Sequence, residues 1–147
     1  MKKILYLLLL TTAISYAQPF KKNYKANQHI PGLTMVKTDV GLYDFIDSSG
    51  KTVTNTPYAK IYKFEKHNPK WTQVKSITGN YGFIDQTGKE VVPTLYKKIY
   101  PFDQHQPNLA LVQTITNHYG YINKTGEMVV KPLFTLDELK NQTHINN

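Results

Sequence analysis

The chain has 147 residues, no cysteine and a formal charge of +8 at neutral pH. The lack of cysteine excludes disulfides, thiol catalysis and thiolate metal sites, so stability must come from packing and sheet hydrogen bonds. Every basic residue is lysine. Arginine provides the planar fork that reads guanine edges, so we expect no sequence-specific nucleic-acid recognition, although lysines can still attract anionic surfaces or glycans.

The first 17 residues have the pattern of a secretory signal peptide. Lys2 and Lys3 precede an apolar run at 4–10, and the small residues Ser15 and Ala17 occupy the two positions that a signal peptidase reads. The apolar run is shorter than the roughly 20 residues of a membrane-spanning helix, and no other apolar stretch reaches that length. We therefore expect an exported protein, periplasmic or secreted, whose mature chain has no membrane span.

One sequence pattern occurs three times at intervals of 38 residues. Residues 43–47 read YDFID, residues 81–85 read YGFID and residues 119–123 read YGYIN. Such self-similarity is typical of repeat architectures, in which each unit buries its faces against its neighbours. Other positions in the same register are Tyr24, Tyr62 and Tyr100; Val36, Val74 and Val112; Gly50, Gly88 and Gly126; Val53, Val91 and Val129; and Tyr58, Tyr96 and Phe134.

The first half of each unit is predicted to be a β-hairpin. Residues 33–38, 71–77 and 109–115 alternate between apolar and polar side chains and are rich in β-forming residues. A tight reversal at 79–80, or at 117–118 in the third unit, then leads into the aromatic strand that contains the repeated motif.

The second half of each unit is predicted to be a turn and two further extended segments. In residues 85–89, Asp85 comes first and Gly88 fourth, which suits a type I turn closed by a glycine at positive φ. Residues 90–92 form the third strand, which Pro93 ends because proline has no N–H for the ladder. Residues 98–102 then lead to the next loop.

These elements predict an all-β protein of three tandem antiparallel meander units, with no helix after the signal peptide. We expect one β domain at 18–137, with repeats at about 24–61, 62–99 and 100–137, and a polar C-terminal tail at 138–147. The pattern leaves open whether the array is open, propeller-like or closed with three-fold symmetry. Oligomeric state is not predicted.

Residues 81–93, which read YGFIDQTGKEVVP, resemble the WG-repeat family. In that family a Trp-Gly-aromatic-Ile-Asp strand leads into a Thr-Gly-Lys turn and a strand that ends in proline. The resemblance covers residues 24–137, with two departures: the tryptophan is Tyr43, Tyr81 and Tyr119 here, and the glycine is Asp44 in the first unit. The family is defined by its repeat, so the resemblance implies the fold rather than an activity.

Three histidines in register are the first candidates for a binding site. His29, His67 and His105 each stand two residues before a proline, and three imidazoles on one rim could converge on zinc. Neighbouring units, however, normally hold equivalent atoms far apart, because each unit contributes several strands. We interpret these histidines as loop residues that can contact a ligand or partner, and we predict no metal site and no cofactor.

The repeated aromatic residues are the second candidates. Tyr62 and Tyr100 border the loops at 63–70 and 101–108, which vary between units. There they suit a contact with a ligand or partner as well as they suit the core. The others favour the core between neighbouring units. They are Phe45, Phe64, Phe83, Phe102 and Tyr121.

No catalytic residue is predicted. Asp47, Asp85 and Asn123 repeat, but their place at the start of a turn explains them as caps of turn amides. The repeat provides no carboxylate pair with separated pKa values and no nucleophile elbow. We therefore expect a non-catalytic module for binding or scaffolding, whose partner is a protein or a polymer of the cell envelope. The alternative is a small-ligand or metal-binding protein that uses the His-x-Pro loops.

Overall fold

The computed structural model describes residues 20–24, 30–65 and 68–145. The predicted signal peptide at 1–17 lies outside this part of the chain. Within the described residues, no helix has both the length and the apolar character needed to cross a membrane.

The protein is all-β, as predicted, and its strands form two antiparallel sheets. The first sheet has the order β1-β2-β3, and the second has the order β10-β9-β8-β7-β6-β5-β4, so each strand of the second sheet pairs with its neighbours in the chain. The strands are β1 Phe20–Asn23, β2 Thr34–Thr38, β3 Tyr43–Ile46, β4 Lys60–Glu65, β5 Asn68–Lys75, β6 Tyr81–Asp85, β7 Glu90–Ile99, β8 Leu109–Thr114, β9 Tyr119–Asn123 and β10 Met128–Phe134.

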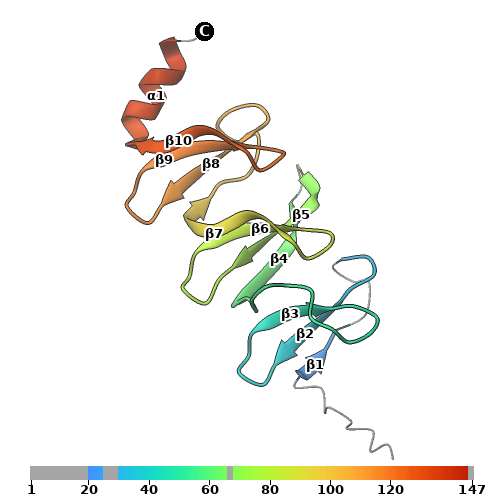
Figure 1. The fold of residues 1–147 in the computed structure, drawn as a ribbon. Helices are drawn as coiled ribbons and strands as arrows, with labels where there is room; N and C mark the ends of the chain where they lie inside the picture. The colour runs from blue at the N-terminus through green and yellow to red at the C-terminus, as the bar shows by residue number, and fades with distance from the viewer. Residues whose placement is uncertain (1–19, 25–29, 66–67, 146–147) are drawn as a thin grey trace, which may run out of the picture.

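The three units stack as an open array (Figure 1). We call them layer 1 (β1 to β3 with residues 52–58), layer 2 (β4 to β6 with residues 90–96) and layer 3 (residues 96–99 with β8 to β10). The closed and propeller-like alternatives are therefore excluded. The staircase arrangement leaves the hairpins of successive layers on one side of the stack and the turns on the other (Figure 1).

Strand β7 belongs to two layers. Its first part pairs with β6, through Phe83↔Val92 and Tyr81↔Tyr96. Its second part pairs with β8, through Tyr96↔Thr114 and Ile99↔Val112. One strand thus carries the sheet from layer 2 into layer 3.

The core lies between the layers, because successive residues of each central strand point to opposite faces. In β6, Phe83 faces layer 3 and Ile84 faces layer 1. The cluster between layers 1 and 2 contains Ile30, Met35, Phe45, Tyr58, Val74 and Ile84. The cluster between layers 2 and 3 contains Trp71, Phe83, Val92, Tyr96, Ile99, Phe102, Ala110, Val112 and Ile122.

The predicted core aromatics are buried wherever their side chains are described. Phe45, Phe83, Phe102 and Tyr121 are at most 6% exposed. The side chain of Phe64 lies outside the described part. Trp71, the lone tryptophan, packs against Phe83 and Phe102 with ring centroids 5.6 and 6.1 Å apart.

The repeated turns have the predicted caps. The Asp85 Oδ1 atom accepts hydrogen bonds from the Thr87 amide at 2.8 Å, the Thr87 hydroxyl at 2.6 Å and the Lys89 amide. Gly88 has a φ of 82°. Asp47 and Asn123 accept the same three kinds of bond in the other layers. The hydrogen bond from the Ser49 hydroxyl is the main reason that the pKa of Asp47 is lowered.

The prediction that no helix follows the signal peptide was wrong. Helix α1, Leu136–Ile145, occupies most of the predicted polar tail. It begins with a capping box: the Thr135 amide and hydroxyl donate to Glu138 at 2.8 and 2.9 Å, and the Glu138 amide donates to the Thr135 hydroxyl. Leu139 is 2% exposed and packs with Leu111 and Tyr121. The helix therefore covers the outer face of layer 3.

Candidate functional site

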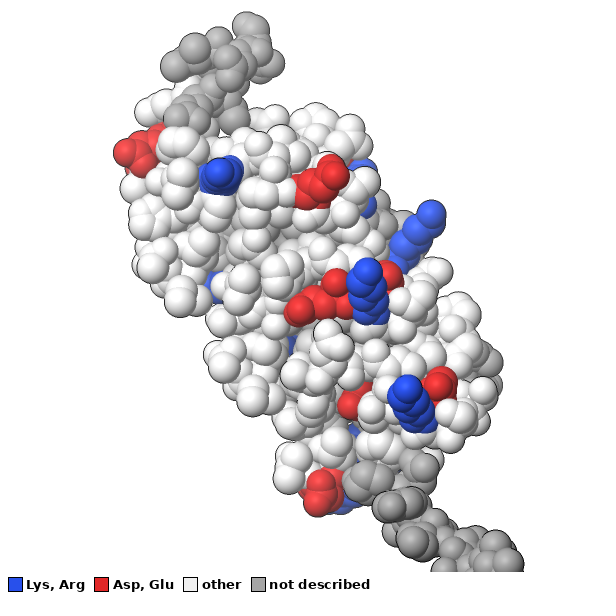
Figure 2. All heavy atoms as spheres, viewed as in Figure 1, with Lys and Arg blue, Asp and Glu red and all other residues white. Residues whose placement is uncertain are grey.

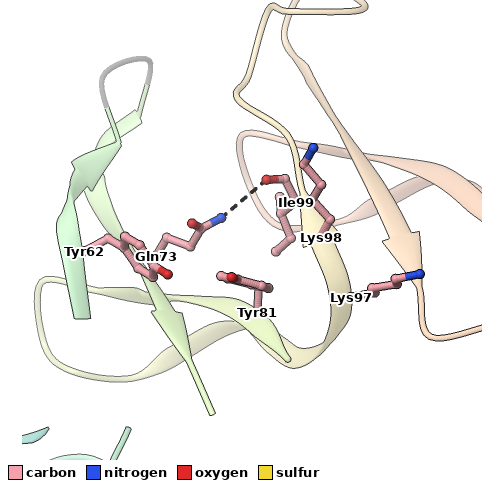
Figure 3. Close-up of a pocket in the computed structure, with 6 residues that line it drawn as sticks. All are labelled: Tyr62, Gln73, Tyr81, Lys97, Lys98 and Ile99. Atoms are coloured by element: carbon pink, nitrogen blue, oxygen red, sulfur yellow. Dashed lines mark hydrogen bonds between the residues drawn. The ribbon is translucent and has the colours of Figure 1, made fainter. Parts of the chain in front are cut away.

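A hollow of about 290 Å³ opens between layers 2 and 3 (Figure 3). We call it the tyrosine cleft. Strands β4 to β7 provide its lining residues, and none of these six described residues is acidic. They are Tyr62, Gln73, Tyr81, Lys97, Lys98 and Ile99.

A pair of tyrosine rings forms one wall of the tyrosine cleft. The rings of Tyr62 and Tyr81 are 6.1 Å apart with an interplanar angle of 41°. The Lys60 ammonium lies 4.6 Å from the centre of the Tyr62 ring, and the Lys75 ammonium lies 5.2 Å from that of Tyr81. Strand register creates this arrangement, because Lys60 is opposite Lys75, and Lys75 is opposite Tyr81.

The two phenol groups have different electrostatic environments. The hydrogen bond from the Tyr62 hydroxyl is the main cause that lowers the pKa of Tyr81, and Lys75 adds to it. Burial is the main cause that raises the pKa of Tyr62, which keeps this phenol as the donor. Of the two phenols, that of Tyr81 is therefore the one that loses its proton more easily.

The other walls bring further lysines to the rim. Gln73 Nε2 donates to the Ile99 carbonyl at 3.5 Å and so links layer 2 to β7. The Lys97 and Lys98 stems line the cleft, while their ammonium groups point away from Tyr81 (Figure 3). The tyrosine cleft thus has an aromatic wall and a cationic rim.

Layer 1 repeats the tyrosine pair. The rings of Tyr24 and Tyr43 are 6.2 Å apart at 44°, with the Lys22 and Lys37 ammonium groups 4.8 and 5.1 Å from their centres. A hollow of about 450 Å³ adjoins this pair and includes one acidic side chain, Asp39. The same arrangement of two tyrosines and two lysines therefore occurs at a 38-residue interval in two layers.

Layer 3 departs from this pattern. Gln113 stands where layers 1 and 2 have Lys37 and Lys75. Tyr100 packs against the His105 ring, 5.2 Å away at 84°, and the Lys98 ammonium lies 4.0 Å from the centre of the Tyr100 ring. Tyr100 and Tyr119 also pack against the cluster beneath α1. Helix α1 therefore covers the tyrosines of layer 3, whereas the tyrosine pairs of layers 1 and 2 lie beside open hollows.

The structure brings together only some of the predicted site residues. Tyr62 lies in the tyrosine cleft, whereas Tyr100 and the exposed His105 contact each other one layer further along. His29 and His67 lie outside the described residues. Among the residues that the structure does describe, no group of three or more His, Asp and Glu side chains could hold a metal ion.

Sequence reasoning missed Tyr81, Lys75, Lys97 and Lys98 as site residues. The 38-residue register could have pointed to the lysines. Lys22, Lys60 and Lys98 repeat at this interval, and so do Lys37 and Lys75. The pairing of Lys75 with Tyr81 across two strands is needed to see that these lysines surround the tyrosines.

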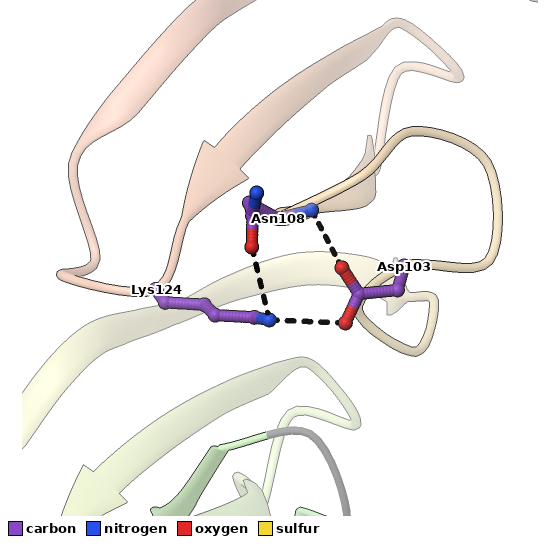
Figure 4. Close-up of polar contacts among 3 residues, drawn as sticks. All are labelled: Asp103, Asn108 and Lys124. Carbon is purple, nitrogen blue, oxygen red and sulfur yellow. Dashed lines mark hydrogen bonds and ion pairs between the residues drawn. The ribbon is translucent and has the colours of Figure 1, made fainter.

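The loop at 101–108 is tied to the body of layer 3. The Lys124 ammonium contacts Asp103 at 3.0 Å and the Asn108 side-chain oxygen at 3.3 Å, and the Asn108 amide donates to Asp103 (Figure 4). Phe102, at the start of the loop, is 1% exposed. The loop that contains the candidate His105 is therefore held in place by Phe102, Asp103 and Asn108.

Steric crowding explains why the repeated motif has glycine at its second position. A Cβ on Gly82 would lie 2.4 Å from the Val92 carbonyl oxygen, and one on Gly120 would lie 2.3 Å from that of Val130. Both glycines are therefore required by the third strand, which crosses directly over the motif.

Comparison with known families finds a match to the model described as WG containing repeat, over residues 81–114 and 119–136. The chain carries WG-containing repeats. The matched WG-repeat segments run from β6 to β8 and from β9 into the start of α1, and they include Gly82 and Gly120. No curated protein and no solved structure matches the chain.

Proposed function

We propose that this WG-repeat protein is an exported, non-catalytic binding module that holds an acidic polysaccharide of the cell envelope. The observation that carries the proposal is the tyrosine pair between two lysines, which occurs on layers 1 and 2 beside open hollows.

The chemistry of the tyrosine cleft suits a charged sugar polymer. Tyrosine combines a flat apolar ring, which packs on sugar C–H groups, with a hydroxyl that hydrogen-bonds. Lysine is a compact, strongly hydrated point charge, so it suits single, spaced carboxylates better than the bidentate phosphate contacts that arginine makes. None of the six described residues that line the cleft between layers 2 and 3 is acidic, so none of them repels such a ligand.

The repeat supports a polymer rather than a single small molecule. Two equivalent tyrosine pairs on one stacked scaffold can bind two segments of the same chain, and the second contact then forms at a high effective concentration. The described turn carboxylates support a non-catalytic role, because Asp47 and Asp85 already accept three hydrogen bonds each within their own turns. The signal-like residues 1–17 support export.

The proposal is tested by calorimetric titration of the processed protein, residues 18–147, with polygalacturonate at low salt and with dextran as the neutral comparison. We expect binding to polygalacturonate alone. Lys75→Gln gives layer 2 the residue that layer 3 has at this position, and should weaken affinity about threefold, as expected for one partly exposed ionic contact.

Lys89→Gln is the matched control, since it removes the same charge from an exposed position on the turn side of layer 2. It should leave the affinity within the error of the measurement. Equal weakening of the affinity by the two variants would show that net charge, and not the position of Lys75, causes the effect. Absence of polygalacturonate binding would refute the proposal.

A further inference from the structure

Each described hairpin tip carries an exposed aliphatic side chain. Val40, Ile77 and Ile115 lie at the tips of the β2–β3, β5–β6 and β8–β9 hairpins and are 74%, 70% and 67% exposed. The three hairpins project from the same side of the stack (Figure 1). We call this side the hairpin edge.

Two leucines extend the apolar character of the hairpin edge. Leu95 is 64% exposed and lies beside Ile115, because the next pair along the ladder is Tyr96↔Thr114. Leu133 holds the equivalent position in layer 3 and is 69% exposed. Single exposed aliphatic residues are ordinary, but a row repeated on each layer is a continuous feature.

A lysine accompanies each tip. A Cβ placed on Gly41 or Gly79 would lie 3.8 Å from the Cε atom of Lys37 or Lys75, so both lysine stems run alongside their tips. At the third tip, the Lys97 ammonium donates to the Asn117 side-chain oxygen at 2.7 Å. Every tip thus pairs an aliphatic group with an ammonium group.

Most acidic side chains of the stack lie elsewhere. Asp47, Asp85 and Glu127 belong to the turns at the far ends of the strands. Asp39 lies at the first tip, and Glu138 interacts with His118 at the third. The space-filling view shows carboxylates over the turns and a largely uncharged margin on the hairpin side of layers 2 and 3, apart from acidic atoms at the top of layer 3 (Figure 2). The edge is therefore both apolar and locally cationic.

We propose that the hairpin edge docks on the surface of a lipid bilayer that contains anionic headgroups. Ile77, Ile115 and Val40 enter the boundary between headgroups and acyl chains, and the accompanying lysines remain at the level of the headgroups. This is the distribution of apolar and basic groups that holds proteins at a membrane interface. An apolar groove of a protein partner would account for the aliphatic tips but not for a lysine beside each one.

This inference does not depend on the polysaccharide proposal, although Lys75 and Lys97 border both surfaces. Its test therefore changes the aliphatic tips and leaves the lysines in place. Bilayer binding is measured by co-sedimentation of the processed protein with vesicles of phosphatidylcholine containing about one-third phosphatidylglycerol, and with vesicles of phosphatidylcholine alone.

We expect binding to the anionic vesicles and a loss of at least about tenfold in partition coefficient for the double variant Ile77→Ser/Ile115→Ser, because two apolar groups no longer enter the interface. The control is Met128→Ser/Val129→Ser, which removes two exposed apolar side chains next to the 123–126 turn. It should bind as the unchanged protein does. Far-ultraviolet circular dichroism checks that both variants are folded.

Equal loss in the two double variants, equal binding to the two kinds of vesicle, or no vesicle binding at all would each overturn the inference. Self-association that disappears in Ile77→Ser/Ile115→Ser, measured without lipid, would assign the edge to a second copy and likewise overturn it. The polygalacturonate titration of the same variant should be unchanged, which separates this outcome from that of the cleft.

Discussion

Layers 1 and 2 share a sequence pattern but differ in their third segment. In layer 2 this segment is part of the continuous strand β7, whereas in layer 1 residues 52–58 meet the central strand only at the isolated bridges Ile46↔Thr52 and Tyr43↔Tyr58. The two third segments differ in sequence, TVTNTPY against EVVPTLY, and opposite them the central strand has Asp44 in layer 1 and Gly82 in layer 2.

The side chain of Asp44 contacts the third segment of layer 1. It is buried, and its carboxylate accepts hydrogen bonds from the Thr54 hydroxyl and from the Phe45 amide. Gly82 leaves that volume to the backbone of Val92 and Pro93. The third segment of layer 1 thus has a polar contact with the motif, whereas the third strand of layer 2 crosses close to it.

The largest effect is expected for Gly82→Asp, which gives layer 2 the layer 1 residue. Its Cβ would lie 2.4 Å from the Val92 carbonyl oxygen, and its carboxylate would be buried without the hydroxyl donor that Thr54 provides in layer 1. We expect a loss of about 3 kcal/mol or more in the free energy of unfolding, measured in urea.

Gly79→Asp is the control for this substitution. It introduces the same side chain at a hairpin tip, where only the φ of 89° opposes the change, so its loss should be clearly smaller. A neutral Gly82→Asp would show that β7 can move aside.

Leu139→Ala tests the end of the stack, where layer 3 has a helix cap. Leu139 is 2% exposed against Leu111 and Tyr121. The substitution should destabilise the fold by about 2–3 kcal/mol, as expected for a large-to-small change in a core. Thermal unfolding followed by circular dichroism measures the loss. Lys140→Ala, on the exposed side of α1, should have little effect.

Gly88→Val compares the turns of layers 1 and 2. Gly88 has a φ of 82°, and its Cβ would lie 2.8 Å from Val53, a residue of layer 1. We expect a loss of about 1–2 kcal/mol or more, because a β-branched residue resists positive φ. Gly50 has a φ of 83°, and no described layer precedes layer 1, so the difference between Gly88→Val and Gly50→Val measures the contact between layers. Equal losses of stability in the two variants would show that the contact between layers does not contribute to the effect of Gly88→Val.

The smallest effect is expected for Asp44→Gly, which gives layer 1 the layer 2 residue. The change removes a buried carboxylate that is hydrogen-bonded, and it frees the space into which 52–58 could move. We expect a net change within about 1 kcal/mol, because the two effects oppose each other. Hydrogen exchange should slow at residues 53–57 if a strand forms there, and unchanged exchange would show that Asp44 is not what interrupts it.

Much of the fold could be predicted from the 38-residue register. The alternation around Phe83 and Ile84 gives both faces of a central strand, and Asp85 with Gly88 gives the turn. The open array could not be predicted, because it depends on β7 pairing with β6 and β8 in turn, and no local pattern records that. Helix α1 was missed although Thr135 and Glu138 spell a capping box, because ten residues with few apolar positions gave no clear helical period.

The site was predicted less well than the fold. Tyr62 and Tyr100 were both identified by their position beside a loop, but Tyr100 lies away from the cleft. His105 was identified by its repeated position before a proline, and it also lies away from the cleft. Tyr81, which lines the cleft, and Lys75, which lies against its ring, come together only through strand register. Repeated residues therefore need their pairing partners before their role can be inferred.

The strand that serves two layers has a consequence for how such a molecule could grow. Layer 2 ends with a strand, β7, that already begins layer 3, so the unit of extension there is one period of sequence rather than a separately folded body. Duplication of one period within the array would supply a new layer whose two surfaces match those of its neighbours. The length of the protein, and with it the number of tyrosine pairs and hairpin tips, could thus change without a new junction.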